Sequence, residues 1–190
     1  MKYSEICQMI ESVWEGDPDE FKLTDSDLDD LITCEKNIVN KVKNPRFEEN
    51  VGQRFFKLDL VASKDSSVAF LFHIRINKEM PLNFSVVLTL PLPTKNLTLF
   101  RCNGPHNEPD DRDPLHSSYH THTVTTNDIQ AKIFNEPKQK LPANYSSILG
   151  AIRHFAQHCN IVDLVHALPQ ELGNIKQISI GDIKNDQQFN

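Results

Sequence analysis

The sequence has little glycine and no paired cysteines, and both shortages exclude common kinds of site. The six glycines are scattered, so they form neither a Walker loop nor a dinucleotide-binding fingerprint, in which glycines at fixed spacing let the backbone approach a phosphate. None of the four cysteines belongs to a Cys-x-x-Cys pair, which argues against a zinc knuckle and a redox motif. We therefore predict free thiols, mostly packed as small apolar groups, at Cys7, Cys34, Cys102 and Cys159.

The chain also lacks a long apolar run. Its most apolar stretch, 84–92, is about half as long as the roughly 20 residues that a membrane-spanning helix needs. The first residues contain no apolar core flanked by basic residues and no small-residue cleavage motif, so we expect no secretory leader. The prediction is a cytoplasmic protein that does not enter a membrane and that needs no organic cofactor.

Positive charge is scarce in the first part of the chain. The formal net charge is −6, and residues 1–50 hold thirteen acidic against six basic residues, whereas the rest holds thirteen against fourteen. This balance does not predict the broad positive surface of a protein that binds duplex DNA. A local basic groove is still compatible with it, and the acidic first fifty residues suit a basic partner.

Hydrophobic residues spaced by three and four predict helices towards both ends of the chain. Side-chain oxygens near residue 24 can cap a helix start, and proline ends a helix. The expected helices cover 4–15, the stretch from Thr24 or Asp25 to Pro45, 145–159 and, as a short element, 161–168. The segment 135–144, which contains Pro137 and Pro142, is expected to be a loop.

Between the helices the hydrophobic period changes to two, which is typical of β-strands. Five short strands are expected, joined mostly by tight turns such as the one at 64–67, over 51–62, 68–76, 83–92, 96–102 and 118–125. Tight turns join antiparallel neighbours, so the sequence predicts an α+β fold with an antiparallel meander of about five strands. Two N-terminal helices and one or two C-terminal helices would pack on this sheet.

The length fits one domain. We expect a single α+β domain over 1–170, made of an acidic helical part (1–50), a sheet (51–125) and a helical part (145–168), and a partly ordered tail over 171–190. A homodimer is a further expectation, because an edge of the sheet has to be covered.

Half of the eight histidines lie within seventeen positions: His106, His116, His120 and His122. The sixteen residues 103–118 would form a loop between two strands, and loops of this length in compact domains are often functional. The clustering therefore marks this segment as the candidate site, against the alternative that it is a polar hairpin whose histidines serve structure.

Strand alternation relates these histidines to Arg101. His120 and His122 share one face of their strand, and on the preceding strand Leu97, Leu99 and Arg101 are expected on one face, with Thr98, Phe100 and Cys102 on the other. If the register puts Arg101 on the side of His120 and His122, a guanidinium and two imidazoles converge, with His106 and His116 at the rim.

Three chemistries suit this set of residues. In metal-free RNA cleavage, one histidine would deprotonate a ribose 2′-hydroxyl, a second would protonate the leaving oxygen, and Arg101 would stabilise the charge on phosphorus. Alternatively, His120 and His122 would bind a divalent metal together with His106, His116 or Asp113. The third chemistry is recognition of an anion or nucleotide without turnover.

Two other polar motifs are weaker candidates. His154 and His158 lie four residues apart on an expected helix, but no acidic residue separates them as in a His-Glu-x-x-His zinc site. The acidic run 25–30 lacks the central glycine and final glutamate of a calcium-binding EF-hand loop. We expect the histidines at the solvent edge or end of their helix and the acidic run at the start of a helix.

The candidate segment also resembles a known family. The stretch "FRCNGPH", a polar loop and then "YHTHTVT" is similar to TumE-like bacterial toxins, which are encoded beside a helix-turn-helix antitoxin, and to a related bacterial family that shares the RCNGPH element. The resemblance covers about 97–122, with weaker similarity to residue 161. The resemblance implies that the candidate phosphate-handling or nuclease site of this chain consists of Arg101, Asn103, His106, His120 and His122.

From the residues and the resemblance together, the first hypothesis is the toxin component of a bacterial toxin-antitoxin or prophage system. It would act as an RNA-directed nuclease and bind a cognate antitoxin. The alternatives are a non-enzymatic module that binds a protein or ligand, and a metal-dependent hydrolase.

Overall fold

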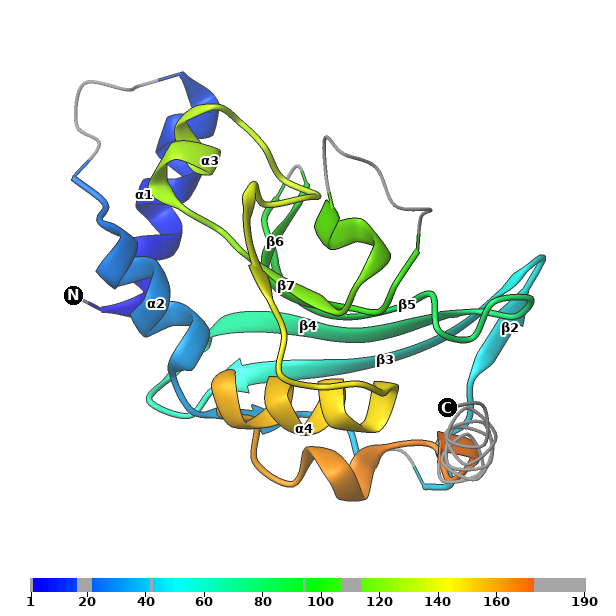
Figure 1. The fold of residues 1–190 in the computed structure, drawn as a ribbon. Coiled ribbons are helices and arrows are strands. Elements are labelled where there is room, and N and C mark those ends of the chain that lie inside the picture. Colours follow the sequence, from blue (N-terminus) through cyan, green and yellow to red (C-terminus); the bar gives the residue numbers. More distant parts are fainter. Residues whose placement is uncertain (1, 17–21, 42, 94, 107–113, 173–190) are drawn as a thin grey trace.

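The computed structural model describes residues 2–16, 22–41, 43–93, 95–106 and 114–172 (Figure 1). Within these residues the fold is α+β, as predicted, with one antiparallel sheet and four α-helices. The helices are α1 (Tyr3–Glu15), α2 (Asp25–Thr33), α3 (Thr126–Gln130) and α4 (Ile148–His158), with 3-10 helices η2 (Pro114–Ser117) and η3 (Leu164–Ala167). The strands are β1 (Lys36–Ile38), β2 (Glu48–Asn50), β3 (Gln53–Ala62), β4 (Asp65–Asn77), β5 (Phe84–Pro91), β6 (Asn96–Asn103), β7 (His120–Thr123) and β8 (Gln139–Pro142).

The sheet is the predicted meander, enlarged at both edges. The five expected strands correspond to β3–β7, and each pairs with the next one along the chain. The strand order is β1-β3-β4-β5-β6-β7-β8, and β2 also pairs with β3. The sheet therefore has eight strands, because short strands extend it beyond β3 and beyond β7.

The prediction of one long helix from Thr24 to Pro45 was wrong. Thr24 does cap α2, since its hydroxyl accepts a hydrogen bond from the Asp27 amide, but α2 ends at Thr33. The following residues form β1, which pairs with β3 and is bound through the Lys36 amide to the Asn160 carbonyl (2.9 Å). Pairing with distant segments has overridden the local helical spacing.

The C-terminal part differs from the prediction in four elements. The expected loop 135–144 contains β8, whose Pro142 lies on an edge strand, where a missing amide hydrogen is tolerated. The expected helix over 145–159 begins at Ile148, and the one over 161–168 is a 3-10 turn. Helix α3 was not predicted. Most of the tail 171–190 lies outside the described residues.

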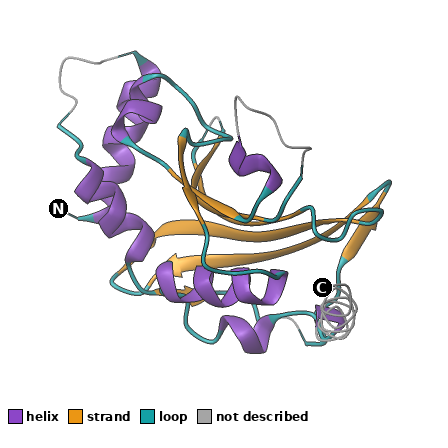
Figure 2. Cartoon of the chain, viewed as in Figure 1, coloured by secondary structure: helices purple, strands orange, loops and turns teal. Residues whose placement is uncertain are grey.

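One face of the sheet is covered by helices and carries the core. Figures 1 and 2 show α4 along the long strands, with α1 and α2 at one end of the sheet. Phe155 of α4 packs against Phe72 of β4 and Phe100 of β6, with ring centroids 5.4 and 5.7 Å apart. Burying side chains of this size stabilises the fold by about 2–3 kcal/mol each. The alternating polar residues of the same strands consequently face the other way.

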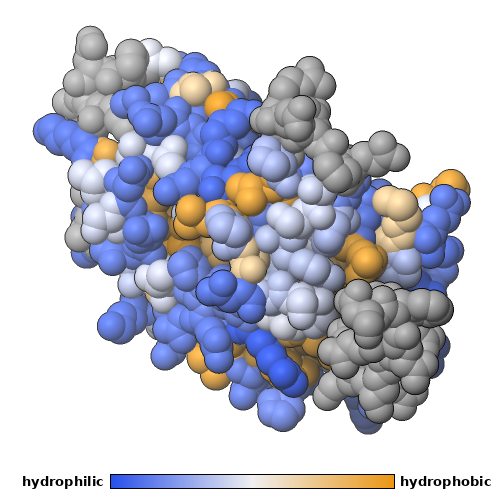
Figure 3. Space-filling view, in the orientation of Figure 1, coloured by the Kyte–Doolittle hydropathy of each residue, from blue (hydrophilic) through white to orange (hydrophobic). Residues whose placement is uncertain are grey.

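The surface and the thiols agree with the composition. Figure 3 shows a mostly hydrophilic face with small, separated hydrophobic areas. Among the described residues, no helix has both the length and the apolar character that crossing a bilayer requires. All four cysteines are free, as predicted, and three of them are buried. Burial raises the pKa of Cys102 to about 12, so this thiol is inert at neutral pH.

Candidate metal centre and basic groove

The register between β6 and β7 brings the predicted residues together. Arg101 lies directly opposite His122, and Asn103 lies directly opposite His120. Directly opposed residues of antiparallel strands project from the same face of the sheet. The register therefore puts Arg101 on the same face as His120 and His122, which strand alternation alone left open.

A β-bulge changes the other half of that prediction. Leu88 pairs with Phe100 and the next residue, Thr89, pairs with Thr98. Leu99 therefore has no partner on β5. As a result Leu97 and Leu99 belong to the core, whereas Thr98 lines the same cavity as Arg101. The expected sharing of one face by Leu97, Leu99 and Arg101 was wrong, because strict alternation does not continue through a bulge.

A chain of hydrogen bonds links Arg101 to His120. Arg101 Nε donates to Asn103 Oδ1 (2.7 Å), and its Nη2 donates to Ser85 Oγ (2.8 Å). Asn103 Nδ2 lies 3.2 Å from His120 Nε2. On the other side of the ring, Nδ1 of His120 lies 2.9 Å from the Ser118 carbonyl oxygen. Since a carbonyl only accepts, Nδ1 carries the hydrogen, and Nε2 accepts from Asn103.

Three imidazoles lie close to one another, and we call His106, His116 (from η2) and His120 the histidine centre. Their ring centroids are 4.7 to 5.6 Å apart. One ligand nitrogen from each ring can be chosen so that all three lie within 4.8 Å of one another. His106 and His116, which belong to the loop predicted to be functional, thus lie next to the buried His120.

Backbone carbonyls fix the tautomers of three of the clustered histidines. The Nδ1 atoms of His106 and His122 lie 2.9 and 2.8 Å from the carbonyl oxygens of Gly104 and Pro137, as Nδ1 of His120 does from Ser118. Each Nε2 therefore keeps its lone pair. In metal sites a ligating histidine commonly donates its second ring hydrogen to a carbonyl in this way.

The electrostatic environment keeps these rings neutral. Burial, and then the neighbouring histidines, lower the pKa of His120 to about 4, although the bond to Ser118 acts in the opposite direction. Burial is also the main cause that lowers the pKa of His106 and of His122. At neutral pH the three rings consequently act as proton acceptors or metal ligands.

His122 lies beside the histidine centre but is not one of its members. Its ring centroid is 4.9 Å from that of His120, and it is fully buried. Within the described part of the chain, its Nε2 is buried without a hydrogen-bond partner. The predicted pair of metal ligands, His120 and His122, is thus not the group that the structure forms, which is His120 with His106 and His116. Asp113, the other predicted alternative, lies outside the described residues.

Several residues that hold the centre were not predicted. The Tyr145 hydroxyl donates to the His120 carbonyl (2.7 Å) and lies 3.2 Å from that of Asn103, which ties β7 to β6. His116 Nε2 lies 2.7 Å from Lys140 Nζ and 3.8 Å from Glu136 Oε1. These partners come from distant segments, so spacing within the histidine-rich stretch gives no sign of them.

Gly104 of the RCNGPH element is required by a close approach of two backbones. A Cβ there would overlap the Leu82 carbonyl oxygen and lie 2.8 Å from the Phe84 ring. We expect Gly104→Ala to lower the free energy of unfolding by about 2–3 kcal/mol and to displace His106, which is bonded to the Gly104 carbonyl. Urea denaturation measures the first effect; Gly150→Ala, where contacts are looser, is the control. Equal stability of the Gly104 variant and the wild type would contradict the close approach.

A cavity of about 600 Å³ lies on the same face of the sheet, and we call it the basic groove. Two neighbouring rows of directly opposed residues pass through the groove and continue beyond it to β7. The rows are Lys57, His73, Val87, Arg101 and His122, and Phe55, Arg75, Ser85, Asn103 and His120. Burial, and then the charge of Arg101, lower the pKa of His73 to about 4, so the cations of the groove are Lys57, Arg75 and Arg101.

The second histidine pair does not form a comparable site. The rings of His154 and His158 are stacked 6.1 Å apart at the end of α4, and His158 packs on Phe100 at 4.3 Å. Neither residue belongs to a cluster of three metal-binding side chains among the described residues. His158 is the last residue of α4, as expected, whereas His154 lies one turn before the end and its ring is 6.2 Å from that of the buried Phe100.

Comparisons with known protein families, curated proteins and solved structures found no significant match. The similarity of the segment 97–122 to TumE-like toxins stays a prediction from the sequence.

Proposed function

We propose that this protein is a metal-dependent hydrolase that cleaves phosphodiester bonds in RNA. The observation that carries the proposal is the histidine centre, in which three donor nitrogens lie within 4.8 Å of one another. Around a zinc ion, with bonds of about 2.0–2.1 Å, tetrahedral nitrogen donors are roughly 3.3 Å apart. Movement of about an ångström by the half-buried rings of His106 and His116 would close the site.

The neighbouring residues suit phosphate chemistry. A divalent metal would supply a Lewis acid and a bound water of lowered pKa. Arg101 would bind a nonbridging phosphate oxygen, because Asn103 and Ser85 hold its Nε and Nη2 and leave further N–H groups on the guanidinium. Asn103 would position Arg101 through its Oδ1. Its Nδ2 donates to the one lone pair of His120 Nε2, so metal binding by His120 would have to replace this hydrogen bond.

The wider role we propose is the toxin component of a bacterial toxin-antitoxin system. It is supported by the resemblance of Arg101, Asn103, His106, His120 and His122 to the motif of TumE-like toxins. The acidic residues of the first fifty positions would suit a basic antitoxin. Expression without a partner is then expected to arrest bacterial growth.

Lys140 favours a second candidate, RNA cleavage without a metal. Its ammonium lies 2.7 Å from His116 Nε2, where it competes with a metal for that lone pair. In this alternative the neutral His120 would act as the base and Arg101 would stabilise the phosphorane charge. Metal dependence separates the two candidates.

The test uses protein purified without a histidine tag and a labelled single-stranded RNA. We expect cleavage to stop in excess EDTA and to return when Zn²⁺ or Mn²⁺ is added back, with about one ion bound per chain. Cleavage that continues in EDTA would favour the metal-free candidate. Absence of cleavage with every divalent metal tested would contradict both.

A further inference from the structure

We propose that the basic groove binds a segment of single-stranded RNA, with its phosphates on Arg75 and Arg101 and a base against Phe55. The inference rests on the proposed function for its biological sense, because it assigns the substrate of the same site. It concerns binding, however, and can be tested in the absence of a metal.

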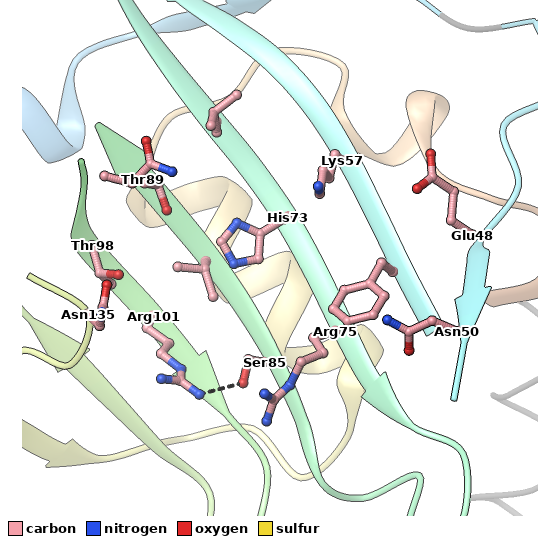
Figure 4. A pocket seen from close by; sticks show the side chains of 14 residues that line it. Glu48, Asn50, Lys57, His73, Arg75, Ser85, Thr89, Thr98, Arg101 and Asn135 are labelled. Carbon is pink, nitrogen blue, oxygen red and sulfur yellow. Dashed lines mark hydrogen bonds between the residues drawn. The ribbon is translucent and has the colours of Figure 1, made fainter. Parts of the chain in front are cut away.

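Two guanidinium groups without carboxylate partners mark the groove as an anion site. Figure 4 shows Arg75 and Arg101 on either side of Ser85, whose hydroxyl accepts the Arg101 bond. Neither arginine forms an ion pair with another described residue, although Glu48 also lines the cavity. Burial, and then the charge of Arg75, lower the pKa of Arg101, and the charge of Glu136 acts in the opposite direction. Like charges held together in this way favour a bound anion, which would relieve their repulsion. Phosphate matches the planar fork of a guanidinium.

A buried hydroxyl gives independent support for a ligand. Thr89 is only 4% exposed and lines the cavity, and its Oγ1 has no hydrogen-bond partner in the described part of the chain. Leaving such a group unpaired costs about 1–3 kcal/mol. Thr98 and Asn135 lie at the same end of the cavity (Figure 4). Neutral donors and acceptors of this kind suit ribose hydroxyls and base edges.

The apolar lining and the size of the groove favour a single strand over a duplex. Phe55, Leu71 and Val87 line the cavity among the polar groups, and an aromatic ring can stack on a base only where that base is unstacked. A volume of about 600 Å³ is in the range of pockets that enclose a small ligand, so the cavity can enclose only a short segment of a strand. The formal charge of −6 also disfavours the extended backbone contacts of duplex binding.

The groove and the histidine centre lie on the same face of the sheet, although the residues of the centre do not line the cavity. Phe55, Arg75 and Ser85 belong to the row of opposed residues that ends in Asn103 and His120. Arg101 contacts Asn103, and Asn103 contacts His120. A strand bound across Arg75 and Arg101 would therefore run towards the centre that cleaves it.

The test is the binding of a fluorescent eight-nucleotide single-stranded RNA, measured by anisotropy in EDTA. We expect Arg75→Gln to weaken binding at least about 10-fold and to reduce the slope of log K against log salt by about 0.7, the value for one phosphate contact on a single strand. Lys57→Gln, on the exposed rim, should act in the same direction. Arg153→Gln on the exposed surface of α4 is the matched control and should bind like the wild type.

The outcomes separate this inference from the proposed function. If cleavage depends on a metal but Arg75→Gln leaves RNA binding unchanged, the proposal that the groove binds RNA is overturned and the proposed hydrolase activity stands. If RNA binding depends on Arg75 but no RNA is cleaved, the groove proposal stands and the proposed hydrolase activity is overturned. Duplex RNA or a mononucleotide bound as tightly as the eight-nucleotide strand would also overturn the assignment to single-stranded RNA.

Discussion

Replacing His120 with alanine is expected to lower the affinity for a divalent metal by more than about 100-fold and to abolish RNA cleavage. Loss of a residue that only supports a metal ligand costs roughly 10- to 100-fold in affinity, so loss of a ligand should cost at least as much. The substitution also removes the acceptor of the Asn103 amide, which helps to hold Arg101. Calorimetric titration with Zn²⁺ and the RNA assay measure the two effects.

Because His120 is fully buried, its replacement can also disturb folding, and His106→Ala is a second variant. His106 is half-buried on the loop and should lose the metal with little change in the melting temperature. The matched control is His166→Ala, an exposed histidine of η3 outside the histidine centre. Metal binding that survives in both His106→Ala and His120→Ala would contradict the role of the centre.

Lys36→Met is expected to destabilise the fold by about 2–4 kcal/mol, because three buried carbonyl groups lose a charged hydrogen-bond donor. Lys36 is fully buried, and its ammonium donates to the carbonyl oxygens of Ile32 (2.6 Å), Cys34 (2.8 Å) and Cys159 (3.1 Å). These carbonyls lie at or beside the C-terminal ends of α2 and α4, where a cation is favoured. Methionine fills the space but leaves all three acceptors unpaired.

Urea denaturation of Lys36→Met, compared with that of the control Lys41→Met, tests the contribution of the Lys36 hydrogen bonds to stability. Lys41 pairs with Asp163 at 3.4 Å, but both side chains are more than half exposed, so its replacement should cost less than about 1 kcal/mol. If the two variants were equally stable, Lys36 would not hold the ends of α2 and α4 together. A large difference would also explain why the chain leaves the helix at residue 34.

The fold could be predicted where local patterning and tertiary pairing agree. Strands β3–β7 alternate apolar and polar residues, and tight turns join most of them, so their order followed from the sequence. The length of the second helix was predicted wrongly, because Ile38 and Val39 continue its helical spacing. In the structure the helix ends earlier, and Lys36 binds carbonyl groups at the ends of α2 and α4. Strand β8 was not predicted, because it is formed by pairing with β7, which lies about twenty residues earlier in the chain.

The candidate site was predictable only in part, for a similar reason. Composition and alternation identified Arg101 and the four clustered histidines, and the resemblance added Asn103. The bulge at Leu99, the Tyr145 bonds and the position of Arg75 in the groove depend on the register between strands. A single sequence does not determine that register, which the sheet fixes through its core.

The most direct test of the account is a crystal structure of the untagged protein soaked with Zn²⁺, with anomalous scattering data. The account predicts one strong peak bound by His106, His116 and His120, with metal to nitrogen distances of about 2.0–2.2 Å. Density for the metal elsewhere on the chain, with these three side chains unligated, would contradict it.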